Sequence, residues 1–299
     1  MKTFYKITII LASLFLLSAT TSKKPSLKHA LKVLDGFCNY VPSGHSVIDG
    51  DTISVQSFYM SKTEITNIQY QEFIYSLMKN NDEEKLAIAK VDSLEWGRIF
   101  KTFSGEQYGK FYHKHPAYHS YPTVNVSREG AELFCEWLTV KYDSLSNGEL
   151  KLKFRIPSRA EWMRAARGDH HEYTYSWKGP FLRNSKGTII ANFVRLGERN
   201  VSRNKVTGRF EIVIIPPVHL SNLSSPDVTA PAKSYWPNEY GFYNMNGNVS
   251  EMISDGEFAV GGDWRAPGYD VRNESIKPFT GAHPTVGFRI VATDIQPEK

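Results

Sequence analysis

The chain has 299 residues, with 36 Lys and Arg against 31 Asp and Glu, 41% hydrophobic residues and 22% charged residues. These ordinary globular proportions exclude a collagen-like, coiled-coil or wholly disordered protein, and the length permits one large domain or two small ones. The formal net charge of +5 is small and no basic stripe stands out, so we expect no nucleic-acid partner.

Residues 1–22 have the pattern of a secretory signal peptide. Lys2 and Lys6 precede an apolar stretch from Ile9 to Leu17, and small polar residues follow it. That stretch is shorter than the roughly 18 residues that a membrane-spanning helix needs, and an uncleaved apolar anchor is the alternative. We therefore expect an exported protein of the periplasm or cell surface, close to a membrane but not spanning it once processed.

Three helices are predicted from capping residues and apolar spacing. Thr66 caps the first, Ser127 begins the second, and Ser158 with Glu161 forms a capping box at the third. Apolar residues recur in these segments at the spacing of a half-buried helix. Those expected to face inward are Tyr70, Phe73, Ile74, Leu77, Met78, Ala131, Phe134, Cys135, Leu138, Trp162, Ala165 and Ala166.

Short β-like runs and long irregular stretches surround these helices. The runs cover residues 54–60, 258–262 and 287–292, and residues 168–250 are rich in Gly, Pro, Asn and Ser. A few helices with scattered short strands indicate an α+β domain. Because we find no internal repeat and no linker, we expect an N-terminal segment at residues 23–38, one domain over residues 39–292 and a tail at residues 293–299.

Cys38 and Cys135 are the only cysteines. Two thiols do not make a disulfide scaffold, and Cys135 falls on the expected buried face of a helix. Neither cysteine lies beside a histidine in sequence, so a Cys–His nucleophile is only weakly indicated.

An ordered series of motifs resembles the formylglycine-generating enzyme, or sulfatase-modifying factor, family. The strongest is Asn238–Glu251, and the series covers roughly residues 39–292. The resemblance implies a single C-type-lectin-like domain with little regular secondary structure. The matching segments are residues 40–44, 60–73, 121–127, 154–168, 238–251, 261–264 and 287–289.

The catalytic cysteines of that family have no counterpart in this sequence. The resemblance implies that the oxidase members hold copper with two cysteines just after a Gly-Gly-Ser strand. The matching positions here are Ala266 and Val271, and no cysteine follows Cys135. A thiolate pair suited to Cu(I) therefore cannot form. We expect no catalytic residues, no copper and no iron.

The resemblance also implies a structural calcium ion. The implied ligands are the side chains of Asn244 and Glu251 and the carbonyl oxygens of Gly247 and Val249. Hard oxygen donors in a compact loop suit calcium, whereas a Gly- and Asn-rich turn with Glu251 capping an amide is the alternative. A second implied site begins at Asn192, and Asp227 is displaced from the position expected for its acidic partner.

Histidines offer the remaining candidates for metal ligands. His113, His115 and His119 lie close in sequence, but Pro116 interrupts any helix and no carboxylate follows at ligand spacing. An exposed aromatic-rich loop is the alternative interpretation. One alternative function, a metal-dependent oxidase or oxygenase, would use these histidines or His283.

Our preferred hypothesis is a non-catalytic binding or scaffold module of the cell envelope, that is, a pseudoenzyme with an envelope protein partner. Residues 115–118 and 175–187 are similar to the sulfatase-modifying-factor-like lipoproteins of bacterial gliding motility and associated secretion, although the chain lacks their lipid-acceptor cysteine. A receptor for a carbohydrate, or for another surface ligand such as a peptide, is a further alternative.

On the binding hypothesis, the surface at the former active site becomes a contact face. Aromatic and arginine side chains are typical anchors of an interface, whereas ordinary loop and core packing is the alternative. The residues expected on this face are Trp264, Arg265, Tyr269, Arg272 and His283.

Overall fold

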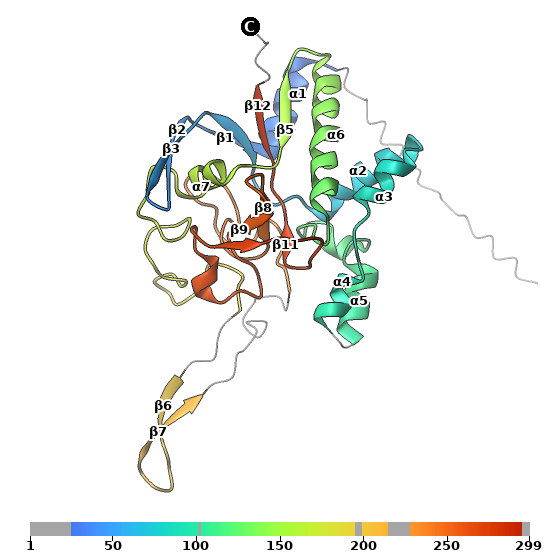
Figure 1. The fold of residues 1–299 in the computed structure, drawn as a ribbon. Helices are drawn as coiled ribbons and strands as arrows, with labels where there is room; N and C mark the ends of the chain where they lie inside the picture. Colours follow the sequence, from blue (N-terminus) through green and yellow to red (C-terminus); the bar gives the residue numbers. More distant parts are fainter. Residues whose placement is uncertain (1–24, 101–102, 195–198, 215–227, 295–299) are drawn as a thin grey trace, which may run out of the picture.

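The computed structural model describes residues 25–100, 103–194, 199–214 and 228–294 (Figure 1). Near its centre, a four-stranded antiparallel sheet joins segments that are distant in the sequence. Its strand order is β1 (Cys38–Val41), β4 (Phe58–Ser61), β12 (Val291–Asp294) and β5 (Leu152–Arg155). The sheet therefore fastens the first described strand of the chain close to the last one.

A second sheet carries the loops of the candidate site. Its order is β10 (Ile276–Pro278), β9 (Phe258–Val260), β8 (Ser250–Ile253) and β11 (Val286–Gly287). β11 runs parallel to β8, and the other pairs are antiparallel. All four residues of β8 are buried, so this strand lies inside the molecule.

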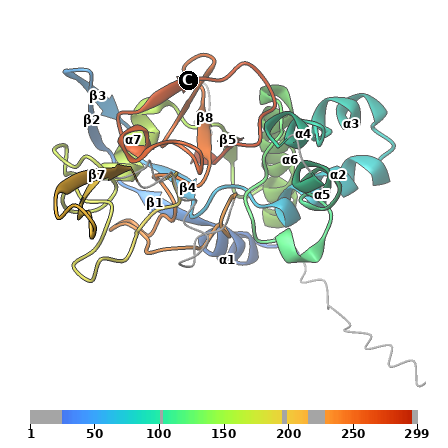
Figure 2. The same ribbon diagram turned by 90° about the horizontal axis from the view of Figure 1, so that it is seen from below.

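Helices cover one side of the first sheet and extend beyond it (Figures 1 and 2). α1 (Leu27–Phe37) packs against α6 (Arg128–Ser146), and α6 packs against β5. The helical region beside α6 contains α2 (Asn67–Lys79), α3 (Glu83–Ala89), α4 (Glu95–Ile99), α5 (Phe103–Phe111) and the short η1 (Pro116–Tyr118).

The remaining elements lie on the other side of the sheets. α7 (Arg159–Arg167) packs against the hairpin of β2 (Gly44–Ile48) and β3 (Asp51–Val55), and η3 (Gly268–Val271) lies in the loop after β9. A second hairpin, β6 (Arg199–Arg203) with β7 (Phe210–Ile214), extends away from the rest of the molecule in Figure 1.

The three predicted helices form where their caps place them. The Ser127 side chain accepts the Gly130 N–H at 3.0 Å, and Ser158 and Glu161 satisfy each other's backbone N–H as a capping box. Thr66 likewise begins α2 with a capping box. Met78 differs from the prediction, because 57% of it is exposed at the last turn of α2.

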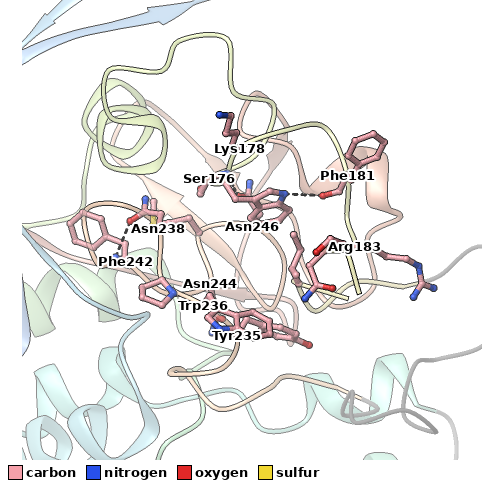
Figure 3. A pocket seen from close by; sticks show the side chains of 16 residues that line it. Ser176, Lys178, Phe181, Arg183, Tyr235, Trp236, Asn238, Phe242, Asn244 and Asn246 are labelled. Carbon is pink, nitrogen blue, oxygen red and sulfur yellow. Dashed lines mark hydrogen bonds between the residues drawn. The ribbon is translucent and has the colours of Figure 1, made fainter. Parts of the chain in front are cut away.

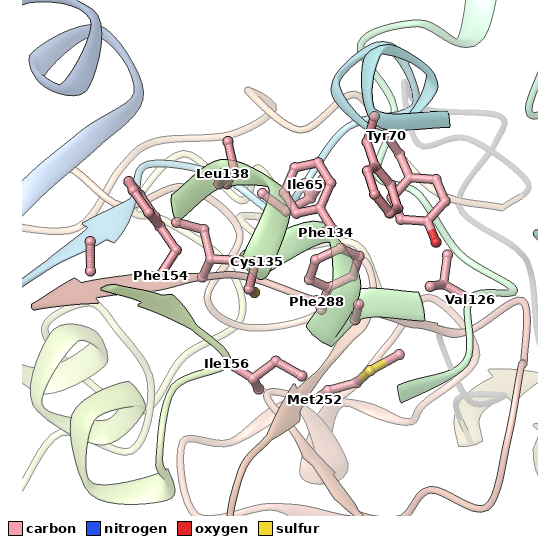
Figure 4. Close-up of a cluster of buried hydrophobic side chains, with 14 of the residues drawn as sticks. Ile65, Tyr70, Val126, Phe134, Cys135, Leu138, Phe154, Ile156, Met252 and Phe288 are labelled. Atoms are coloured by element: carbon pink, nitrogen blue, oxygen red, sulfur yellow. The ribbon is translucent and has the colours of Figure 1, made fainter. Parts of the chain in front are cut away.

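The largest hydrophobic core lies between α6, α2 and the two sheets (Figure 4). Phe134 of α6 packs against the rings of Tyr70, Phe73 and Phe288 at centroid separations of 5.6–5.8 Å. Aromatic pairs at these separations contribute about 0.5–1.5 kcal/mol each beyond the area that they bury. This core holds α6 against both sheets, including the edge strand β5 of the first sheet.

Two predicted strands are each divided into two. Residues 54–60 contribute the end of β3 and most of β4, and residues 287–292 contribute the end of β11 and the start of β12. In both cases the chain leaves one sheet and enters another, so a single strand is impossible. The described part of the expected N-terminal segment, residues 25–38, contains α1, whose Ala30 and Leu34 are buried.

No helix in the described part of the chain is long and apolar enough to cross a membrane. The predicted signal peptide at residues 1–22 lies outside the described residues.

Candidate functional site

The loop before β8 has a left-handed backbone at several positions. Asn244, Gly247 and Asn248 have φ values of 52°, 78° and 66°. Position 247 requires glycine for two reasons. Its φ is positive, and a Cβ there would lie 2.4 Å from the Asn192 carbonyl oxygen. The Asn248 N–H donates to that same oxygen at 2.7 Å. The structure thus brings Asn192 directly beside the predicted calcium loop.

Glu251, at the second position of β8, lies in a buried ion pair. Only 1% of Glu251 is exposed, and its carboxylate accepts hydrogen bonds from Arg289 at 2.8 Å and from the Trp162 indole at 2.7 Å. Arg289 is fully buried and also donates to the carbonyl oxygens of Ser61 and Tyr243. The pair therefore ties β8, α7 and β4 together through charge-assisted hydrogen bonds.

Glu64 is a second buried carboxylate, which the sequence analysis did not single out. Its side chain accepts hydrogen bonds from Asn248 Nδ2 at 2.8 Å and Asn244 Nδ2 at 3.3 Å. Burial raises the pKa of Glu64 to about 8, and the Arg289 charge opposes this shift. The available signal was its place in the Lys62–Asn67 motif, directly before the cap of α2.

We call Glu64, Asn244, Asn248, Glu251 and Arg289 the polar cluster. It holds two carboxyl groups and one guanidinium. Either Glu64 carries a proton, as its raised pKa indicates at pH 7, or a bound cation balances its negative charge. Asn244 Oδ1 is buried and has no hydrogen-bond partner. A free amide oxygen beside buried carboxylates fits a hard cation such as calcium.

The second predicted calcium site receives less support from the geometry. The Asn192 side chain donates to the Val228 carbonyl at 2.8 Å and to Asn248 Oδ1 at 3.2 Å. Asp227 lies outside the described residues. Within residues 25–100, 103–194, 199–214 and 228–294, no three His, Cys, Asp or Glu side chains gather in a group that could hold a metal ion. A cation at the polar cluster would therefore need amide and backbone oxygens.

The positions that match the copper-binding cysteines lie in an apolar environment. Val271 is fully buried in a cluster with Tyr175 and Phe193, and Ala266 packs against the same cluster. Cys38 and Cys135 are both buried and free, and burial raises the pKa of each thiol. Neither thiol is therefore available as a thiolate ligand or nucleophile at neutral pH.

Trp264, expected on the contact face, is instead part of the core. Only 2% of it is exposed, its ring stacks on Phe100 at 5.8 Å, and its indole N–H donates to the Pro284 carbonyl at 3.1 Å. The reason is that the chain turns directly after the glycine pair at the end of β9, which places this side chain inward among Trp96 and Phe100.

The other four residues expected on the contact face remain accessible. Arg265 and Tyr269 are exposed, and the Arg272 guanidinium lies 3.6 Å from the centroid of the Tyr269 ring. His283 is half-buried, and its Nδ1 lies 2.8 Å from Thr285 Oγ1. Burial and the nearby Lys277 charge lower the pKa of His283, so the ring is neutral at pH 7. Arg272 and His283 line separate cavities, both of which Lys277 also lines.

The structure does not unite the histidines near residue 115. His113 is buried with its Nδ1 3.2 Å from Asn67 Oδ1, whereas His115 is exposed. Burial lowers the pKa of His113 to about 3. Because one ring is buried and the other faces solvent, His113 and His115 do not bind one metal ion together.

A cavity of about 410 Å³ lies between residues 176–190 and residues 235–246, and we call it the aromatic cleft (Figure 3). Phe181 and Trp236 are 71% and 66% exposed on it. In Figure 3, Lys178 and Phe181 lie above the centre and Tyr235 and Trp236 lie below it. Sequence reasoning missed this cleft because 44 residues, 191–234, separate its two walls in the chain. The first wall carries a family similarity in residues 175–187, but nothing in the sequence pairs it with the second wall.

Comparison with known proteins matches residues 18–294 to the family model described as sulfatase-modifying factor enzyme 1-like domain. The formylglycine-generating enzyme of Mus musculus is 25% identical over 228 residues, which are 68% of this chain and 50% of that protein. The enzyme of the same name from Streptomyces coelicolor is 25% identical over 251 residues, 77% of this chain and 66% of that protein. The chain thus spans half to two thirds of these relatives.

Two solved structures show the same fold. CarF superposes with a TM-score of 0.51 at 18% identity, over 87% of this chain and 98% of CarF. Treponema denticola variable protein 1 gives a TM-score of 0.50 at 15% identity, over 85% of this chain and 94% of that one.

Proposed function

The chain belongs to the sulfatase-modifying factor family, and on that premise we propose that it is a non-catalytic binding module of the cell envelope. Its single domain has the α+β, C-type-lectin-like fold of the family. Because one fold can host both enzymes and binders, the function has to be argued from the residues at the site.

The environment of Ala266 and Val271 is the observation that carries the proposal. Neither side chain offers a donor atom, and both pack in the apolar cluster around Tyr175 and Phe193. Copper(I) in proteins is bound by soft sulfur or imidazole ligands, and the two thiols of this chain are buried elsewhere. The residues present therefore do not fit the copper site of a formylglycine-generating enzyme.

Tyr269 and Arg272 support binding at the former active-site surface. The stacked pair is a partly apolar anchor with a positive charge, and Arg265, in the same loop after β9, is a second exposed guanidinium. Such side chains are enriched among the residues that dominate binding energy at protein interfaces. The signal-peptide pattern at residues 1–22 supports export.

Calcium fits this proposal as a structural ion. It would be held by the side chains of Asn244 and Glu251 with the carbonyl oxygens of Gly247 and Val249. Binding of the ion would displace the proton that the raised pKa leaves on Glu64 at neutral pH. The ion would supply charge compensation in the polar cluster rather than chemistry on a substrate.

Cross-linked capture from the native envelope tests the binding function. The mature protein should retain one stoichiometric protein partner, and Tyr269→Ala with Arg272→Ala should reduce its recovery about tenfold or more. The matched control is Tyr75→Ala with Lys79→Ala on α2, since Tyr75 is 67% exposed and Tyr269 68%. Unchanged capture by the Tyr269 and Arg272 variant would remove this face from the proposal.

An activity assay tests the non-catalytic part. The purified chain is incubated with copper and a cysteine-containing sulfatase peptide, with the Streptomyces coelicolor enzyme as the positive control. We expect no formylglycine by mass spectrometry and no stoichiometric copper or iron by elemental analysis. Formylglycine formation, or one redox metal per chain that is lost in His283→Ala, would overturn the proposal.

A further inference from the structure

We propose that the aromatic cleft binds an acidic saccharide. This inference rests on the proposed function only in treating the domain as a binder, and it concerns a different surface from Tyr269 and Arg272. The cleft has the size of a small-molecule site, since such sites measure about 300–1,000 Å³ and combine aromatic walls with a few polar groups.

The exposed rings give the cleft flat apolar surfaces. Phe181 and Trp236 are 71% and 66% exposed, and both line the same cavity. Trp177 is held in place, because its ring stacks on Tyr175 at 4.9 Å and its indole N–H donates to the Phe181 carbonyl at 2.8 Å. Rigid aromatic faces of this kind suit the C–H face of a sugar ring.

The backbone beside Trp236 is strained. Tyr235 has a φ of +61°, a left-handed conformation that is a genuine outlier for a bulky residue. Such a conformation costs on the order of 1–3 kcal/mol and occurs preferentially where the chain forms a binding site. The strain lies at the wall that presents Trp236.

The charge of the cleft selects an anion. Lys178 and Arg183 line it, and none of its lining residues is acidic. Arg183 lies at the rim of the cleft, where its side chain extends outward in Figure 3 and donates one guanidinium nitrogen to the Gly187 carbonyl at 2.7 Å. Its other N–H groups can meet an anion that reaches this rim. Glu239, the acidic residue within the second wall, pairs with His170 instead.

The polar lining favours hydroxyl groups over a peptide or a nucleotide. Serine and asparagine side chains line the cleft. The amides of Asn238 and Asn246 are held by hydrogen bonds within the protein. Ser185 and the side-chain nitrogen of Asn184 are therefore the groups that can meet a sugar hydroxyl. None of the lining residues belongs to a described strand or helix, so the cleft offers no sheet edge for an extended peptide and no helix N-terminus for a phosphate.

Calorimetry with defined probes tests the inference. The probes are trigalacturonate, sialyllactose and sulfated lactose, with neutral lactose and tri-aspartate as comparisons, all at low ionic strength. We expect at least one acidic sugar to bind with a Kd below about 1 mM, and lactose and tri-aspartate to bind about tenfold more weakly or not at all. Trp236→Ala and Arg183→Gln should each weaken binding about tenfold, whereas Lys186→Gln, in the same loop but outside the lining, should not.

Each other outcome overturns the inference. Absence of binding by all three acidic sugars removes the ligand class, and equal binding of tri-aspartate shows that charge alone is recognised. Retained binding in the Trp236 and Arg183 variants places the sugar elsewhere. Because capture of the protein partner is measured separately on the Tyr269 and Arg272 variant, failure here does not affect the proposed function.

Discussion

The polar cluster and the aromatic cleft are neighbours that meet at Asn244, yet they use polar side chains in opposite ways. In the cluster, Glu64, Glu251 and Arg289 are almost fully buried, and their charges are engaged with each other or with amides. In the cleft, Lys178 and Arg183 keep their charges at the surface beside exposed rings. Burial makes the first group essential to the fold, and exposure leaves the second free to bind a ligand.

The largest expected effect comes from breaking the cluster at Arg289. Arg289→Met leaves two carboxyl groups buried without their guanidinium, and losing one partner of a buried pair costs about 3–5 kcal/mol. Urea unfolding monitored by circular dichroism measures it. Lys151→Met is the control, because both side chains of its pair with Asp143 are at least half exposed and its loss should cost less than about 1 kcal/mol. Equal losses in the two variants would contradict the special role of the cluster.

Removing calcium should produce the next largest change. If the ion is present at one hundred times its Kd, its loss lowers stability by about 2.7 kcal/mol. For a domain of this size that corresponds to a fall in Tm of about 5–10 °C. Differential scanning calorimetry with and without chelator measures it, and Glu64→Gln should reduce the difference. If chelation does not change the Tm, no calcium is bound, and a proton on Glu64 balances the charge of the polar cluster instead.

Acid should destabilise the protein through His113. Its folded pKa of about 3 lies below the unfolded value of 6.5, so its stabilising contribution is complete above pH 6.5 and is lost as the pH falls toward 3. One proton changes stability by at most about 1.4 kcal/mol per pH unit. Urea unfolding between pH 7 and pH 4 should show a shallower decline for His113→Gln than for the wild type. His115→Gln, on an exposed ring, should follow the wild type.

The smallest effect on stability is expected in the cleft. Trp236→Ala removes a mostly exposed ring and should change the free energy of unfolding by less than about 0.5 kcal/mol. Urea unfolding checks this value beside the loss of saccharide binding. A large destabilisation would indicate that the ring packs in the native core, and the contrast between cleft and cluster would fail.

Local signals in the sequence were sufficient for the helices with strong caps. Ser127 and Ser158 begin α6 and α7 as predicted, because a cap involves only residues within one turn. The helices between residues 83 and 111 were not predicted, since they are short and α4 has no side-chain cap. Short helices depend on tertiary packing, here of Trp96 against Tyr112 and Trp264.

The sequence alone determined the family, the α+β class and the missing cysteine pair, because these follow from residue identity and the order of motifs. Only the tertiary structure decided that Trp264 is buried, that Glu64 joins Glu251 and Arg289, and that residues 176–190 and 235–246 form one cleft. The physical reason is range. Caps and motifs act between near neighbours, whereas burial, charge balance and cavities depend on segments that are distant in the chain and meet only when it folds.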